Sequence, residues 1–270
     1  MNITNLEHKG SRVDVSNLIN ILWENDGQTE DFFLQEIDGR PIQIQKRILG
    51  QMDEAWHFLK HRADGYSFNL TNNPALQTEV FNSESNIIQV SKNVDYRTIV
   101  SIRSQEAIYK QIDTNPRPNA LVIVSMLISS DNKLVLGQRV FYGDWPVPTY
   151  ESPGAFLTYQ DLAEGSIVKA ATQKVRGDFE ENIPLKATPL VIYHFPRIFE
   201  TVIVCIARID KPASKLRAKK YLNIMAVDNT KEELTRVIGM PLNLFHPPSR
   251  TALQYYFDNF AHLSTKNLIY

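Results

Sequence analysis

Two apolar segments are the most informative about the fold: Leu121-Val-Ile-Val-Ser-Met-Leu-Ile-Ser129 and Leu134-Val-Leu-Gly-Gln-Arg-Val140. Both runs are apolar and rich in branched residues, a composition that favours buried β-strands. The residues between them, Ser130-Asp-Asn-Lys133, are typical of a hairpin turn. The sequence therefore predicts an antiparallel strand pair early in the second half of the chain.

Strands and helices follow this hairpin without regular alternation. After a long loop from Tyr142 to Gly154, the patterns predict a helix over 162–181, strands over 190–195, 201–209 and 222–227, and a last helix from Arg250 to about His262. This order favours an α+β fold, with a mixed sheet packed between helices, over a doubly wound parallel sheet.

The best domain boundary is the polar run Asp113-Thr-Asn-Pro-Arg-Pro118. We therefore predict an N-terminal α/β region over 1–117 and a second domain over 118–270. In the first region, apolar residues at spacings of three and four predict a helix from Ile44 to near Gly65, and Asp95 is a candidate N-cap for another.

Composition excludes several function classes. The 270 residues carry a formal net charge of -1, so a strongly basic nucleic-acid-binding domain is not expected. No apolar run approaches the roughly 20 residues that cross a bilayer, and no leader pattern is visible, which predicts a cytoplasmic protein. The single cysteine, Cys205, lies in an apolar strand and excludes a disulfide framework within the chain.

The most informative polar cluster is Arg176-Gly-Asp-Phe-Glu-Glu181, at the end of the predicted 162–181 helix. Asp178 and Glu181 are three residues apart and would share a helix face, with Glu180 beside them. Like charges on one face repel unless a cation neutralises them, and Mg²⁺ prefers carboxylate and phosphate oxygens. The alternative is a solvated acidic helix end, which the helix dipole slightly disfavours.

The second half of the chain, residues 119–263, resembles the Nudix hydrolase superfamily. Four local motifs carry the resemblance: the hairpin ending in Arg139, Trp145 followed by Ser152-Pro-Gly-Ala155, the paired Ala170-Ala171, and Ile224-Met-Ala-Val-Asp-Asn-Thr-Lys-Glu-Glu-Leu234. The resemblance implies a Nudix-like fold.

The Nudix box itself, G-x5-E-x7-R-E-U-x-E-E-x-G-U with U a bulky aliphatic residue, is eroded. One register takes Val175 as U. Its three carboxylate positions then hold Lys174, Gly177 and Asp178, so that one acid survives.

A second register takes Phe179 as U and places Asp178, Glu181 and Asn182 at the carboxylate positions. We prefer this register at the sequence level because it keeps two acids on one face. A longer loop and an altered box also occur in a Nudix branch that cleaves UDP-glucose, and the stretches Glu54-Ala-Trp56 and Asn73-Pro-Ala-Leu76 resemble its N-terminal region.

The resemblance implies a hydrolase acting on a nucleoside diphosphate linked to another group, UDP-sugar-like or ADP-ribose-like. Mg²⁺ or Mn²⁺ held by Asp178 and Glu181 would activate water, with Glu180, Glu181 or Glu164 as catalytic acids. Candidate substrate-binding residues are Arg139, Arg176, Trp145, Gly154 and Phe156, since arginines offset phosphate charge and aromatic rings stack on bases or sugars.

Two further hypotheses stay open. The same pocket could hold a nucleotide-like ligand, or dock a partner, without hydrolysing anything, because the carboxylate set is incomplete. The fold could also serve other small-molecule chemistry. Under any of these hypotheses, residues 1–117 would either complete the pocket or form the interface of a homodimer.

Overall fold

The computed structural model describes residues 19–27, 31–39, 42, 44, 46–64, 72–104, 118–139, 148–179, 185–196 and 198–266. The strands are β1 (Asn20–Glu24), β2 (Phe33–Glu36), β3 (Pro74–Asn82), β4 (Ile87–Asp95), β5 (Ala120–Ile128), β6 (Lys133–Arg139), β7 (Thr149–Glu151), β8 (Gly154–Phe156), β9 (Leu185–Phe195), β10 (Glu200–Ile209) and β11 (Asn223–Asp228). The α-helices are α1 (Lys46–Asp64), α2 (Tyr96–Ser104), α4 (Tyr159–Glu164), α5 (Ile167–Asp178), α6 (Lys231–Ile238), α7 (Pro247–Asp258) and α8 (Phe260–Thr265).

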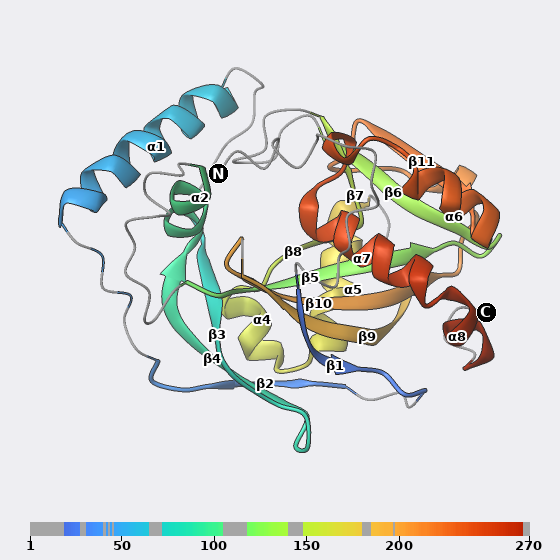
Figure 1. The fold of residues 1–270 in the computed structure, drawn as a ribbon, viewed down its shortest axis with the longest axis horizontal. Helices are drawn as coiled ribbons and strands as arrows, with labels where there is room; N and C mark the ends of the chain where they lie inside the picture. Colours follow the sequence, from blue (N-terminus) through green and yellow to red (C-terminus); the bar gives the residue numbers. More distant parts are fainter. Residues whose placement is uncertain are drawn as a thin grey trace.

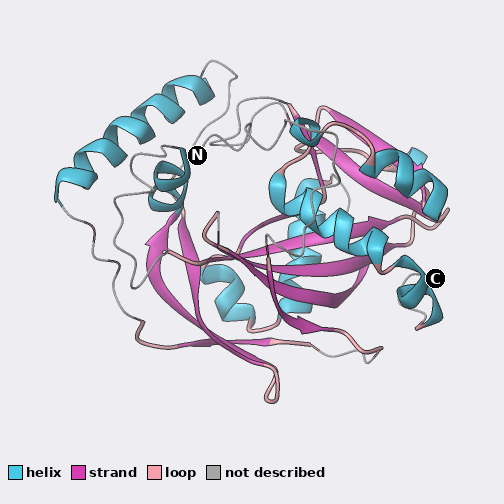
Figure 2. Ribbon diagram, viewed as in Figure 1, coloured by secondary structure: helices cyan, strands magenta, loops and turns pink. Residues whose placement is uncertain are grey.

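These strands form one mixed sheet (Figures 1 and 2). At its centre β5 runs parallel to β10, whereas β9 is antiparallel to β10 and β11 is antiparallel to β6. The predicted hairpin is present, since β6 turns back on β5 with Leu127 opposite Val135. Every residue of β5 is buried, which is typical of a strand covered on both faces.

Helices cover both faces of the sheet. On one face, Ala170 and Ala171 of α5 pack on Ile123 and Ile203. On the other face, Leu253 of α7 packs in a cluster with alternate residues of the same central strands. The predicted α+β fold, a mixed sheet packed between helices, is therefore confirmed.

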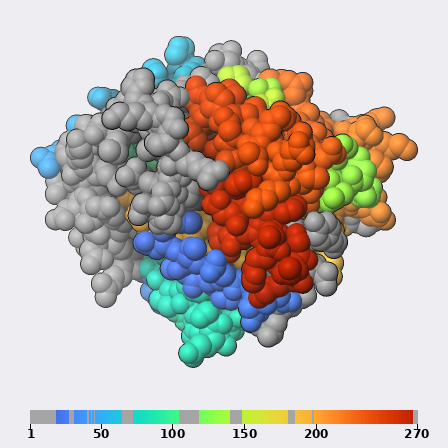
Figure 3. Space-filling view, turned by 45° about the vertical axis from the view of Figure 1, so that its right-hand side comes forward, coloured from blue at the N-terminus to red at the C-terminus, as the bar shows by residue number. Residues whose placement is uncertain are grey.

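Strands from the N-terminal region extend this same sheet. Gln77 of β3 pairs with Ala120 of β5, and β1 pairs with β9. The Tyr255 hydroxyl of α7 donates a hydrogen bond to Glu24 Oε1 at 2.6 Å, so the C-terminal helices lie beside the first strand (Figure 3). The predicted regions 1–117 and 118–270 thus share one sheet, and the boundary between them stays a prediction.

The predicted helix over 162–181 is wrong in its limits. It is two helices, α4 and α5, separated at Gly165, whose φ of 70° is a left-handed conformation that ends α4. A second helix, α5, starts from the N-cap Ser166 and ends at Asp178. Among the described residues, no helix is both long and apolar enough to cross a membrane.

Candidate functional site

The end of α5 places one acidic side chain inside the protein. Val175 on this helix packs into the core, and Asp178, three residues later, is fully buried at the last helical position. Phe179 then adopts an extended backbone and bridges to Ala218. The helix therefore ends at Asp178, and Glu181, which the sequence placed on the same helix face, lies outside the described residues.

Both carboxylate oxygens of Asp178 have partners. Lys220 Nζ lies 2.8 Å from Oδ1, and Arg139 Nη2 lies 3.5 Å from the same oxygen. The Tyr221 hydroxyl donates to Oδ2 at 2.8 Å, and the backbone N–H of Gly154 donates to it at 3.3 Å. The two ion pairs and the two hydrogen bonds together offset part of the cost of burying this carboxylate.

The backbone explains why Lys220 and Tyr221 arrive at this point. The N–H of Lys219 donates to the carbonyl of Asp178 at 3.0 Å, which uses one of the free carbonyls at the helix end. The N–H of Leu222 then donates to the carbonyl of Gln138 at 2.8 Å, in line with the pairing of β11 and β6. The segment that precedes β11 is therefore fixed between α5 and β6.

A second buried carboxylate lies on the other side of Arg139. Glu151, at the end of β7, is 2% exposed and forms an ion pair with the Nε of Arg139. Burial raises the pKa of Glu151 to about 7, although the nearby Arg139 opposes this shift. This carboxyl therefore titrates near neutral pH.

Two glycines make the close packing here feasible. A Cβ on Gly137 would lie 2.3 Å from the ring of Tyr221, and a Cβ on Gly154 would lie 2.1 Å from the carbonyl oxygen of Ile123. The Tyr221 ring also lies 5.4 Å from the Arg139 guanidinium carbon, a cation–π distance. Burial raises the pKa of the Tyr221 hydroxyl, which favours its role as a donor to Asp178.

We call Arg139, Glu151, Asp178, Lys220 and Tyr221 the Asp178 network. It contains two cations, one carboxylate held by both of them, and a second carboxyl that is partly protonated at pH 7. Its net charge at neutral pH therefore lies between zero and plus one. The described part of the chain holds no group of three or more His, Cys, Asp or Glu side chains that could bind a metal ion.

The box register can now be decided from the helix. Phe179 lies outside α5 in an extended conformation, so the register that takes Phe179 as the aliphatic position is wrong. Val175 is buried on α5 and fits that position. The carboxylate positions of the resemblance then hold Lys174, Gly177 and Asp178, and Lys174 Nζ pairs with Asp161 Oδ2 at 2.7 Å.

The other predicted site residues lie elsewhere in the fold or outside its described part. Phe156 packs against the ring of Tyr96 and lies 5.8 Å from the Arg103 guanidinium carbon. Glu164 and Arg176 are exposed, on α4 and α5 respectively. Three further candidates, Trp145, Glu180 and Glu181, lie outside the described residues.

Sequence reasoning missed three members of the network. Glu151 stands directly before Ser152-Pro-Gly-Ala155, one of the motifs that carry the resemblance, and this position was the available signal. Lys220 and Tyr221 precede a predicted strand, and only the tertiary pairing of that strand brings them to α5. No pattern along the chain encodes this contact.

Comparisons with known proteins give structural matches only. No protein-family model and no curated protein matches this chain. A NUDIX hydrolase from Nitrosomonas europaea is similar at 12% identity and a TM-score of 0.39, over 54% of this chain and 74% of that one. The MutT protein from Methanosarcina mazei is similar at 12% identity and a TM-score of 0.38, over 54% of this chain and 97% of that one.

A third similar structure is a bifunctional NMN adenylyltransferase/ADP ribose pyrophosphatase from Francisella tularensis, complexed with AMP and a Mn ion. It matches at 11% identity and a TM-score of 0.38, over 58% of this chain and 51% of that one. These names agree with the Nudix resemblance seen in the sequence. Because each TM-score is below 0.5, we base the function on this chain's own contacts.

Proposed function

We propose that this protein is a Nudix-like binding protein that holds an anionic, nucleotide-like small molecule without metal-dependent hydrolysis. The observation that carries the proposal is the ammonium group of Lys220, 2.8 Å from the carboxylate of the one acid that remains in the box. A protein cation thus stands beside the oxygen that a metal ion would need. The nucleotide-like class of the ligand comes from the sequence resemblance.

A divalent metal would have to break existing contacts to reach Asp178. Its Oδ1 is shared by Lys220 and Arg139, and its Oδ2 accepts hydrogen bonds from Tyr221 and Gly154. Mg²⁺ also requires several oxygen ligands in a near-octahedral arrangement. The residues aligned with the other two carboxylate positions, Lys174 and Gly177, have no side-chain oxygen to offer.

The same network is suited to an anion. The Lys220 side chain is 46% exposed and reaches the surface, and that of Arg139 is 16% exposed, while their carboxylate partners stay buried. A phosphate oxygen can approach such cations from the solvent side without displacing Asp178. Charge-assisted hydrogen bonds of this kind are among the stronger polar contacts in proteins.

The hydrolase hypothesis places different demands on the chain. It needs Glu180 and Glu181, which follow Phe179 and lie outside the described residues, to supply the missing carboxylates. Glu164 is exposed at the end of α4 and is separated from α5 by the turn at Gly165. A measurement of substrate turnover therefore distinguishes the binding protein from the hydrolase.

The test is a panel of UDP-glucose, ADP-ribose and a dinucleotide, each with Mg²⁺, with Mn²⁺ and with a chelator. We expect at least one compound to raise the melting temperature equally with metal and with chelator, and to be recovered intact by mass spectrometry. Lys220→Met should abolish this stabilisation. The matched control is Lys215→Met, which removes an exposed lysine of the same segment outside the network.

Two results would overturn the proposal. One is metal-dependent cleavage that disappears when Asp178→Asn and Glu181→Gln are combined, which would restore the hydrolase. The other is a melting temperature that no compound in the panel changes, which would exclude a nucleotide-like ligand.

A further inference from the structure

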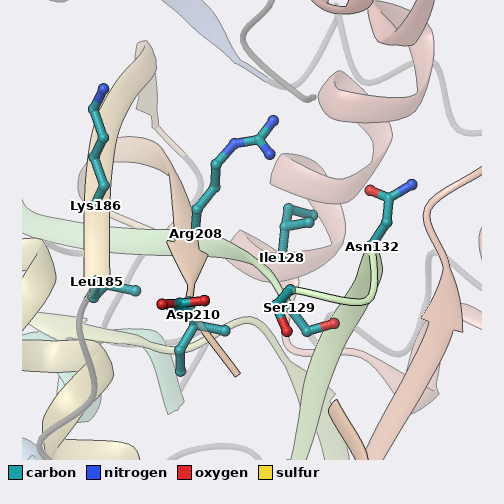
Figure 4. A pocket seen from close by; sticks show the side chains of 9 residues that line it. Ile128, Ser129, Asn132, Leu185, Lys186, Arg208 and Asp210 are labelled. Atoms are coloured by element: carbon teal, nitrogen blue, oxygen red, sulfur yellow. The ribbon is translucent and has the colours of Figure 1, made fainter. Parts of the chain in front are cut away.

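A second candidate site lies on the sheet away from the Asp178 network. A cavity of about 700 Å³ opens where β5, β9 and β10 meet the β5–β6 turn (Figure 4). Its polar lining includes Ser130, Asn132, Lys186, Arg208 and Asp210. The volume is sufficient for a small metabolite.

Two of the lining residues are cations on neighbouring strands. Arg208 of β10 is paired in register with Lys186 of β9, so their side chains leave the same face of the sheet. Figure 4 shows both side chains extending in the same direction. Like charges directly opposite each other in a sheet repel, and a bound anion between them would remove that repulsion.

This pair lies on the face of the sheet that does not carry α5. Ala207 and Ile209, on either side of Arg208, pack in the cluster that contains Val175 of α5. Ile206 packs in the cluster that contains Tyr256 of α7. Because side chains alternate along a strand, Arg208 points to the α7 face, and its site is separate from the Asp178 network.

The guanidinium of Arg208 is incompletely satisfied. Its Nη2 is buried and has no hydrogen-bond partner. Burial also lowers the pKa of Arg208, which shows that this charge lies in a partly desolvated position. A buried donor without a partner is costly, and an oxyanion in the cavity would supply the missing acceptor.

The acidic residue in the lining does not fill this role. Figure 4 shows the Asp210 carboxylate on the opposite side from the ends of Lys186 and Arg208. Within the described residues, neither cation forms an ion pair with a carboxylate. The positive charge of the pair is therefore not neutralised by an ion pair within the described residues.

We propose that this cavity binds a small oxyanion, a phosphate or carboxylate group of a metabolite, held by Arg208 and Lys186. The guanidinium offers a planar pair of donors and the ammonium a point charge, a combination that suits tetrahedral and planar oxyanions alike. Ser130 and Asn132 provide neutral polar groups at the rim of the same cavity. The site is independent of the proposed function of the Asp178 network.

The experiment is calorimetric titration of the full chain with inorganic phosphate, pyrophosphate and malonate, at constant ionic strength set by chloride. We expect saturable binding of at least one of these anions; phosphate and malonate separate the two chemical classes. Arg208→Gln and Lys186→Gln should each weaken that binding by about tenfold or more, since each removes a charged hydrogen-bonding partner. Lys186 is exposed, so its variant is expected to fold normally.

Control variants distinguish binding at this cavity from binding at the Asp178 network and from non-specific attraction to surface lysines. Lys60→Gln removes an exposed lysine of α1 and should leave anion binding unchanged. If none of the three anions binds, or if binding survives both Arg208→Gln and Lys186→Gln, the proposal is overturned. Anion binding that is lost only in Lys220→Met would assign the anion to the other site.

Discussion

Lys220 Nζ lies 2.8 Å from Asp178 Oδ1, at the carboxyl end of α5. An aspartate at this end of a helix is unfavourable, because the helix dipole places partial negative charge there. The lysine offsets both this effect and the burial of the carboxylate. We interpret the contact as an internal replacement for a metal ion, and it leads to measurable consequences.

The first prediction concerns Asp178→Asn. The substitution leaves Arg139 without one of its carboxylate partners, and it removes the counter-charge of Lys220. Breaking a buried ion pair from one side is costly, so we expect the free energy of unfolding to fall by about 2–4 kcal/mol. Urea denaturation measures this change.

A metal site without its metal would behave in the opposite way. Removing one acid from a cluster of carboxylates relieves repulsion, so Asp178→Asn would then leave stability equal or higher. Glu164→Gln is the matched control, because Glu164 is exposed, and its effect should stay within about 0.5 kcal/mol.

The second prediction is a pH dependence of stability caused by Glu151. Its pKa of about 7 in the folded protein lies above the ordinary value of 4.5. Between these values the folded protein retains a proton that the unfolded chain releases. The contribution of Glu151 therefore stabilises the fold at low pH and is lost as pH rises through 7, on the order of 3 kcal/mol in total.

Chemical denaturation from pH 4 to pH 8 tests this dependence against Glu151→Gln. The amide does not titrate, so the variant should lack the part of the pH slope that Glu151 causes. Identical slopes in the two proteins would mean that folding does not shift the pKa of Glu151, which would contradict this prediction.

The third prediction concerns Lys174, which stands where the Nudix box has an acid in the register that fits α5. Lys174 pairs with the buried Asp161 at 2.7 Å, and Asp161 in turn accepts hydrogen bonds from the backbone and hydroxyl of Thr158. Lys174→Glu would place two carboxylates together and should destabilise the fold by about 2–3 kcal/mol. A variant that is as stable as the wild type and gains metal-dependent turnover would contradict this account.

The fourth prediction concerns Gly154, which the sequence suggested as a substrate-binding residue. A Cβ at this position would lie 2.1 Å from the carbonyl oxygen of Ile123, so β8 can approach β5 only with glycine here. Gly154→Ala should lower the free energy of unfolding by about 3 kcal/mol or more. Gly50→Ala on α1 is the control, because nothing lies within 4 Å of its added Cβ.

Local patterns predicted much of the fold. The hairpin of β5 and β6, the helix α1 and the cap Asp95 before α2 follow from hydrophobic periodicity and capping chemistry, which act over a few residues. Strand β1, by contrast, is fixed by its pairing with β9, which lies far along the chain. Such long-range pairing is not encoded in a local pattern.

The candidate site was predictable only in part. Arg139 and Asp178 were found, since both stand at the ends of well-marked elements. Their environment was not, because the sequence suggested an acidic, metal-binding helix end, whereas the fold surrounds Asp178 with cations from β6 and from the segment before β11. The network forms only when folding brings together charged residues that are far apart in the sequence.

The most direct test is titration of the intact protein with Mn²⁺, followed by electron paramagnetic resonance of the free ion. If Lys220 replaces the metal, Mn²⁺ should remain free at protein concentrations of about 0.1 mM. One Mn²⁺ bound per wild-type chain, and released by Asp178→Asn, would contradict the account.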